Sequence, residues 1–312
     1  MRIASGTQLG LACIVFTLFI LQQCPAQTAP EPAPALTGQA VTDALDPAAL
    51  VHRALVENKR SLDGLRNFIF LSDVREDDFG KENRVTKTTV RQEEIFFIDG
   101  EPVQRTLTVN GQPLSDAERS KQEQEIEAKI TDARSATPHH REERQKKAAK
   151  ALADEIEMRE DVADGFVFTV TGKEACGAHT CVEISAEPMP GFKGKSRIRA
   201  LLPFIHGTLT IDADAGQWTR IDVTPLRKLG AGIVYLNEET ALHFEQQPIV
   251  DGPWVLTKTD IRLDSRLLWE RKNLRLQRTN TSFRRFGSKV RIVNAELPTP
   301  ASTEEKAFPA QP

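Results

Sequence analysis

The sequence lacks the short motifs that mark common catalytic sites. Its 312 residues contain no Gly-x-Ser-x-Gly elbow, no glycine loop that could cradle a phosphate and no His-Glu-x-x-His pair. Tyrosine occurs once, at Tyr235, which removes a common source of nucleophiles. His139 and His140 are adjacent, so on a helix they point in different directions and are poorly placed to share a metal ion. We therefore predict no catalytic residue, no metal and no cofactor, and expect that the protein is not an enzyme.

With one exception, the sequence also lacks long apolar runs. The exception, Leu9–Leu21, follows the basic Arg2 and precedes small residues with a possible cleavage point after Ala26. This pattern is typical of a secretory signal peptide, and the run is too short to span a membrane comfortably. A formal net charge of -3 gives no general attraction to nucleic acid. We predict that residues 1–26 are a signal peptide and that the mature protein is periplasmic, without a transmembrane helix.

Cysteine is scarce, with four residues in the whole chain. Cys13 leaves with the predicted signal peptide. Cys24 follows Leu21 at the spacing of a lipoprotein signal, but the preceding residue is Gln23 where a small one is normal, so simple cleavage is favoured over lipidation.

The two remaining cysteines, Cys176 and Cys181, flank a turn between strand-like runs. In an oxidising compartment this arrangement favours a disulfide. The alternative is a metal site that adds His179, but two thiols and one histidine within six residues match no standard zinc spacing.

The first part of the chain predicts a linker, a helix and three strands. Residues 27–45 are rich in proline and alanine and are expected to be an unstructured linker. Asp46 and Pro47 are typical of the start of a helix, which should bury one apolar stripe and end near Gly64. The strands are expected at 67–77, 84–97 and 102–109, and the second is so polar that much of it should be solvated.

The segment 115–160 is strongly charged, with 12 acidic and 10 basic residues among 46. Ser115 and Glu118 form a capping box, which predicts helices over 116–136 and 141–160. Apolar anchors are few, namely Ile126, Ile130, Leu152 and Ile156. We expect an exposed helical arm held by ion pairs, with a surface for a protein partner as the alternative.

The second half of the chain predicts long antiparallel strands. They are expected at 165–171, 182–186, 207–212, 217–223, 232–246, 254–264 and 267–286. Between 196 and 204 either a strand or a helical turn is possible. The folded region should be one domain over 46–294, followed by a disordered tail at 295–312.

Apolar residues recur on one face of several predicted strands. They are Phe68, Phe70, Leu209, Ile211, Ile221 and Val223, together with the tryptophans Trp218, Trp254 and Trp269. A filled core explains such a pattern, and a curved sheet could also leave part of the face as an apolar cavity. Between Arg266 and Arg291, nine residues are basic and only Glu270 is acidic, which suits either anionic head groups, an acidic partner or acids within the chain.

The chain resembles the bacterial outer-membrane lipoprotein-sorting proteins (LolA/LolB-like). The most recognisable feature is the hairpin of residues 201–212 and 218–221, and the export signal, the first helix and the antiparallel meander add to the resemblance. The resemblance covers residues 47–291 and implies an α+β fold. A curved antiparallel half-barrel sheet would carry helices across its mouth over an apolar cavity. The charged segment 115–160 is an insertion relative to the small carriers of that family.

We therefore expect a periplasmic, non-enzymatic carrier or sensor that binds a lipid or an acylated lipoprotein in the half-barrel. Its ligand residues would be Phe68, Phe70, Leu209, Ile211, Trp218, Ile221, Val223 and Trp254. The alternative is a structural or interaction protein of the cell envelope that binds a partner through the charged helices.

Overall fold

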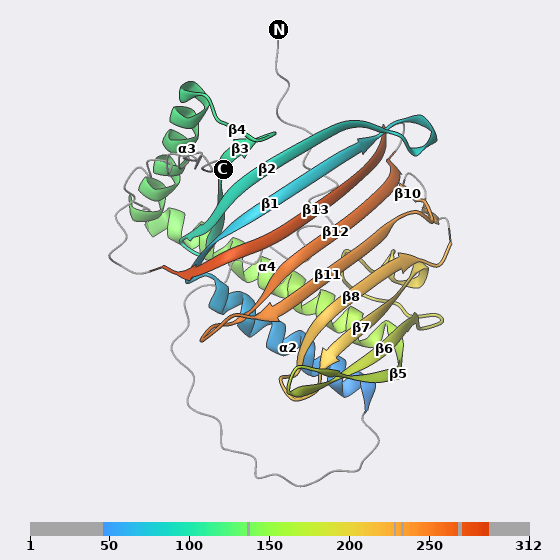
Figure 1. Ribbon diagram of the computed structural model, residues 1–312. Coiled ribbons are helices and arrows are strands. Elements are labelled where there is room, and N and C mark those ends of the chain that lie inside the picture. Colours follow the sequence, from blue (N-terminus) through green and yellow to red (C-terminus); the bar gives the residue numbers. More distant parts are fainter. Residues whose placement is uncertain (1–45, 136–137, 228, 232–233, 268–269, 287–312) are drawn as a thin grey trace, which may run out of the picture.

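The computed structural model describes residues 46–135, 138–227, 229–231, 234–267 and 270–286. Within them, one antiparallel sheet dominates the fold, with its strands in the order β4-β3-β2-β1-β13-β12-β11-β8-β7-β6-β5 (Figure 1). The short β9 and β10 extend from β12. The strands are β1 Phe68–Phe79, β2 Val85–Ile98, β3 Glu101–Val109, β4 Gln112–Pro113, β5 Phe166–Cys176, β6 His179–Pro188, β7 Ile205–Asp212, β8 Gln217–Pro225, β9 Leu229–Ala231, β10 Val234–Leu236, β11 Ala241–Pro248, β12 Trp254–Leu267 and β13 Glu270–Arg285.

The first and last long strands lie side by side in the sheet. β1 pairs with β13 from Phe68 opposite Arg285 to Asp78 opposite Leu274. Most other neighbours are joined by hairpins, as the turn residues predict. Strands β4 and β5 end the order, so the sheet does not close on itself over the described residues. The predicted α+β fold with an open antiparallel sheet is confirmed.

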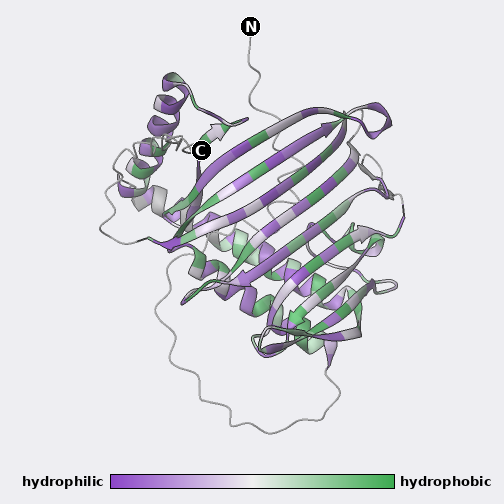
Figure 2. Ribbon diagram, viewed as in Figure 1, coloured by the Kyte–Doolittle hydropathy of each residue, from purple (hydrophilic) through white to green (hydrophobic). Residues whose placement is uncertain are grey.

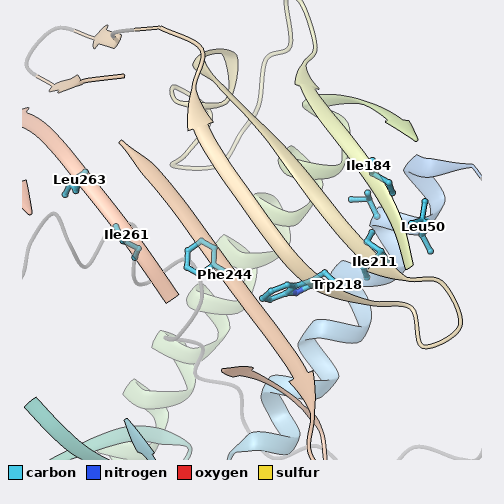
Figure 3. Close-up of a cluster of buried hydrophobic side chains, with 10 residues drawn as sticks. Leu50, Ile184, Ile211, Trp218, Phe244, Ile261 and Leu263 are labelled. Carbon is cyan, nitrogen blue, oxygen red and sulfur yellow. The ribbon is translucent and has the colours of Figure 1, made fainter. Parts of the chain in front are cut away.

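Helix α2 (Pro47–Leu65) begins where the sequence predicts. The Asp46 side chain accepts a hydrogen bond from the backbone N–H of Ala48 at 3.0 Å, and Pro47 occupies the first helical position. The helix lies against β5, β7, β8 and β12. Its buried residues, among them Leu50, Val51 and Ala54, pack on apolar side chains of β6, β7, β8, β11 and β12 (Figure 3). We call the face of the sheet that α2 covers the inner face, and the opposite one the outer face.

The charged segment forms two helices, α3 (Asp116–Ser135) and α4 (Pro138–Asp164). The predicted capping box is present, since Glu118 accepts hydrogen bonds from the N–H and the hydroxyl of Ser115. Both helices are largely hydrophilic (Figure 2). No helix among the described residues is long and apolar enough to cross a membrane.

The apolar anchors of these helices behave differently from one another. Ile126 of α3 is buried against Ile69, Phe96 and Val103, which strand alternation places on the outer face. Ile156 of α4 is 41% exposed, so it is not an anchor. The end of α4 is held instead by Met158, which packs in a small cluster with Phe166, Ala186, Ile198 and Leu202.

Two segments differ from, or refine, the sequence expectation. The strand predicted over 232–246 is interrupted because the chain turns between β10 and β11. In this turn the backbone N–H of Asn237 donates to the carbonyl of Asp264, and the backbone N–H of Thr240 donates to the carbonyl of Asn237. The segment 196–204 consists of turns and a short 3-10 helix, Leu202–Phe204. The predicted signal peptide, Cys24, the predicted linker and tail, and Trp269 lie outside the described residues.

Candidate ligand-binding face

The sequence-predicted ligand residues of β7 and β8 lie together on the inner face. Ile211 and Trp218 are almost fully buried in the core beneath α2 (Figure 3). Leu209 and Ile221 are partly buried against the same core, and Val223 is half-buried opposite Leu242. The structure thus brings these five residues together, two of them as packing partners of the helix. Their ligand-binding role stays a prediction.

The other predicted ligand residues lie elsewhere. Phe68 and Phe70 are buried on β1, where the ring of Phe70 stacks on Phe283 with centroids 5.0 Å apart. Trp254, at the start of β12, lines a surface groove described below. The eight residues are therefore spread over three places rather than around one cavity.

Apolar side chains extend along the inner face beyond the residues that contact α2 most closely. Buried Ile261 and Leu263 of β12 stand opposite Leu276 and Leu274 of β13, which are only partly buried. Leu256 of β12 is also partly buried against this cluster. The leucines of β13 continue the apolar face toward β1.

A row of polar side chains interrupts the inner face on β1, β2 and β13. Ser72 stands opposite Glu93 on one side and Asn280 on the other, and we call these three residues the polar row. They are 0%, 5% and 8% exposed, respectively. Ser72 Oγ, Glu93 Oε2 and Asn280 Oδ1 have no hydrogen-bond partner, although Asn280 Nδ2 donates to the carbonyl of Leu256 at 2.8 Å. A buried polar atom without a hydrogen bond lowers the stability of the folded protein, so such atoms usually have a partner such as water or a ligand.

Charged residues border the polar row. Arg91 Nε donates to Glu93 Oε1 at 3.3 Å, and its Nη2 donates to Glu76 Oε2 at the same distance. Arg278 Nη2 lies 3.5 Å from Glu93 Oε2. Burial lowers the pKa of Arg278, and the neighbouring Glu93 carboxylate opposes that shift. Two arginines and two glutamates thus make a group with no net charge.

Sequence reasoning did not find the polar row. The strand over 84–97 reads as polar on both faces, and such a strand carries no alternation that says which side chains point inward. The pairing of β2 with β1 is what shows which side chains point inward. Phe70 of β1 stands opposite Ile95 of β2, and because alternate residues of a strand share a face, Glu93 and Arg91 lie on the same face as Ile95.

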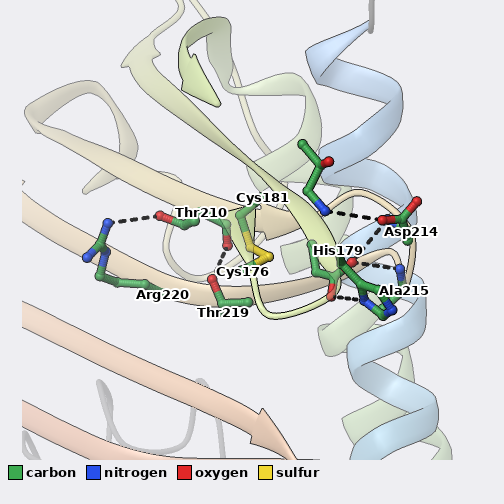
Figure 4. Close-up of a disulfide and its surroundings, with 10 residues drawn as sticks. Cys176, His179, Cys181, Thr210, Asp214, Ala215, Thr219 and Arg220 are labelled. Atoms are coloured by element: carbon green, nitrogen blue, oxygen red, sulfur yellow. Dashed lines mark hydrogen bonds and ion pairs between the residues drawn. A yellow bond between two sulfur atoms is a disulfide. The ribbon is translucent and has the colours of Figure 1, made fainter. Parts of the chain in front are cut away.

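The predicted disulfide between Cys176 and Cys181 is present, with sulfur atoms 2.09 Å apart (Figure 4). It joins β5 to β6 beside their turn, so these thiols are not available as metal ligands. A groove of about 650 Å³ lies next to it, lined by the turn, by β7, β8 and β11, and by Trp254.

His179 closes one side of this groove. Its Nδ1 lies 2.7 Å from Asp212 Oδ2, and this hydrogen bond raises the pKa of His179. Asp214 completes a group of three potential metal ligands. However, Asp212 Oδ1 also accepts the N–H groups of Asp214 and Ala215, and Asp214 accepts that of Thr180. These hydrogen bonds connect the β5–β6 hairpin to the β7–β8 turn, so the three side chains have a structural role without a metal ion.

The outer face carries cross-strand ion pairs. Asp260 of β12 binds Arg275 at 2.6 Å, and Glu94 of β2 binds Arg284 at 2.7 Å. Together with the Glu93–Arg278 pair on the inner face, these contacts show that acids of the same chain neutralise three residues of the basic run between Arg266 and Arg291.

Comparison with known proteins gives fold-level likeness only. No protein-family model and no curated protein matches the sequence. Among solved structures, the chain is similar to a LolA superfamily protein from Nitrosomonas europaea, with 8% identity, 77% of this chain and 93% of that chain covered, and a TM-score of 0.28. A protein domain assigned to outer membrane lipoprotein sorting, from Vibrio parahaemolyticus, has 9% identity, 78% and 95% coverage and a TM-score of 0.32.

The family expected from the hairpin is among the structural neighbours. A DUF1329 family protein from Desulfovibrio piger is similar as well, with 12% identity, 77% of this chain and 93% of that chain covered, and a TM-score of 0.29. Identities and TM-scores this low support no conclusion about what this chain binds or does.

Proposed function

We propose that this protein is a periplasmic, non-enzymatic carrier or sensor that holds the acyl chain of a lipid or acylated lipoprotein against the inner face of its sheet. The observation that carries the proposal is the apolar strip on β12 and β13, where the partly buried Leu274 and Leu276 extend the core beyond α2. Acyl chains bind to such surfaces because burying apolar area from water is favourable. The export signal predicted at residues 1–26 supports a place in the envelope.

Native mass spectrometry of the protein from a periplasmic extract tests the proposal directly. We expect a fraction of the molecules to carry a co-purified lipid, and the delipidated protein to bind a fluorescent fatty acid. Protein that carries no lipid and binds no acyl probe would refute the carrier function.

The variant Leu276→Asn locates the binding surface. Leu276 is only partly buried, so a polar group there should weaken acyl binding about tenfold or more while the protein still unfolds cooperatively. Val90→Asn is the matched control, because Val90 is an aliphatic residue 41% exposed on the outer face. Ile211→Asn, in the packed core, should instead unfold the domain.

A second candidate function uses the charged helices as a docking surface for an envelope partner. It is favoured by α3, where Ile126 is the buried residue and many charged side chains remain exposed. Intrahelical pairs such as Lys146–Glu142 hold the polar surface of α4. Cross-linking in cells, followed by charge reversal at Lys121 and Glu125, would distinguish this function, since it predicts loss of a partner without loss of acyl binding.

A further inference from the structure

We propose that the polar row Ser72, Glu93 and Asn280 binds the primary ammonium of a zwitterionic phospholipid head group of the phosphoethanolamine type. This inference rests on the proposed lipid-binding function and names the class of lipid that would be held. It starts from three buried oxygen atoms on adjacent strands that no hydrogen bond satisfies, although one of them, Glu93 Oε2, lies 3.5 Å from the Arg278 guanidinium.

The number and type of these atoms select the ligand group. Glu93 Oε2 and Asn280 Oδ1 can only accept hydrogen bonds, and Ser72 Oγ can accept one as well. A primary ammonium carries three N–H donors and no acceptor, which matches three acceptors. The register places Ser72 directly between Glu93 and Asn280, so the three oxygens come from neighbouring cross-strand positions on one face.

The surrounding charges select the rest of the head group. Glu76, Glu93, Arg91 and Arg278 together carry no net charge, so an isolated ammonium would leave an excess positive charge in a buried place. A phosphate in the same head group restores the balance. Arg91, whose side chain is 29% exposed, borders the row one cross-strand pair away and can meet a phosphate oxygen.

The position of the row also suits an amphiphile. Apolar residues lie on the inner face on both sides of it, with Phe70 and Phe283 toward one end of the strands and Leu274 and Leu276 toward the other. An acyl chain can therefore cover apolar surface while the head group meets the polar row.

The experiment compares lipids that differ only in the number of N–H donors. Delipidated protein from a periplasmic extract is titrated with phosphatidylethanolamine, its N-methyl and N,N-dimethyl derivatives and phosphatidylcholine, all with the same acyl chains. Affinity should fall at each methylation, by about tenfold or more over the series, because a quaternary ammonium has no N–H to donate. Equal affinity across the series would overturn the head-group site and leave the acyl carrier intact.

Two variants test whether the polar row causes the preference. Ser72→Ala removes one acceptor and should reduce the preference for phosphatidylethanolamine severalfold, without lowering the thermal midpoint of the lipid-free protein. Ser265→Ala is the matched control, because Ser265 Oγ is equally buried and equally without a partner but lies on β12, outside the row. Glu93→Gln should abolish the preference. A preference that survives both Ser72→Ala and Glu93→Gln, in protein that unfolds cooperatively, would overturn the assignment.

Soluble glycerophosphoethanolamine separates this inference from the function on which it rests. Much weaker binding than that of the lipid is expected, because the head group alone buries no apolar surface. Equally tight binding would support the head-group site and overturn the acyl carrier. If no lipid of the series binds, the acyl carrier and the head-group site both fail, and buried water is then what satisfies the three oxygens.

Discussion

At the scale of single residues, His243 on the outer face is held between two carboxylates. Its Nδ1 lies 2.7 Å from Asp222 Oδ1 and its Nε2 lies 2.7 Å from Glu245 Oε1, while Asp260 and Lys258 face it from β12. Burial lowers the pKa of His243, but the two carboxylates outweigh burial and raise it above the usual value. Folding stability therefore depends on pH through this histidine.

Because the folded pKa is raised, the contribution of His243 is fully present below the unfolded pKa and is lost as pH rises through the folded pKa. We predict that His243→Gln costs on the order of 1 kcal/mol at about pH 5.5 and clearly less at about pH 8.5. Urea unfolding of both proteins at the two pH values measures this. A cost that is the same at both would contradict the ion pairs.

The disulfide is a second feature at this scale. Cys176 and Cys181 are separated by five positions, so the loop that it closes is short. In the chain-entropy model such a loop stabilises the fold by about 2 kcal/mol. We predict that replacing both cysteines by serine lowers the free energy of unfolding by that amount. Reducing the disulfide of the native protein should lower it equally. Peptide mapping without reductant should recover the two cysteines linked, and free thiols at both would contradict it.

At the scale of elements, the charged helices can be tested through their anchors. Ile126 of α3 is 4% exposed against the sheet, whereas Ile156 of α4 is 41% exposed. Ile126→Ala should cost about 2–4 kcal/mol through lost burial and a new void, and Ile156→Ala should cost less than about 1 kcal/mol. Thermal or denaturant unfolding of the two variants gives the comparison. Equal costs would mean that the helices are either both part of the core or both detached from it.

If residues 115–160 form an exposed arm, as the sequence predicts, they should be dispensable for the fold, and the packing of Ile126 bears on how this prediction is tested. Replacing them with a short linker would expose Ile69, Phe96 and Val103 on the outer face and would remove Met158 from its cluster with Phe166 and Leu202. Adding polar substitutions at the three outer-face positions is therefore part of a fair deletion experiment, because newly exposed apolar surface by itself promotes aggregation.

At the scale of the whole molecule, a bound amphiphile should stabilise the fold, because a ligand that binds only the folded state shifts the unfolding equilibrium. At a ligand concentration about 100-fold above the dissociation constant, the gain is about 2.7 kcal/mol, which raises the thermal midpoint by roughly 5 to 10 °C. We expect this shift with phosphatidylethanolamine and a smaller one with phosphatidylcholine. A midpoint that no lipid moves would argue against both proposals.

Features that depend on neighbouring residues could be predicted from the sequence. Asp46 and Pro47 start a helix because the cap and the first helical position have local requirements, and the structure begins α2 there. Asp99-Gly100 and Asn110-Gly111 turn the chain with positive φ angles, as hairpin turns require. The disulfide joins cysteines on the two strands of one hairpin, so spacing and compartment sufficed to predict it.

Features that depend on distant pairing were decided by the tertiary structure. The pairing of β1 with β13 joins residues that are 196 (Asp78 and Leu274) to 217 (Phe68 and Arg285) positions apart, and no local pattern encodes it. The same pairing, with that of β2, turns Glu93 and Arg278 inward, whereas a shift of one residue would have turned them outward. The sequence by itself therefore determined the helices, the hairpins and the disulfide, because those are settled by local chemistry. The buried polar row exists because three strands from opposite ends of the chain share one face.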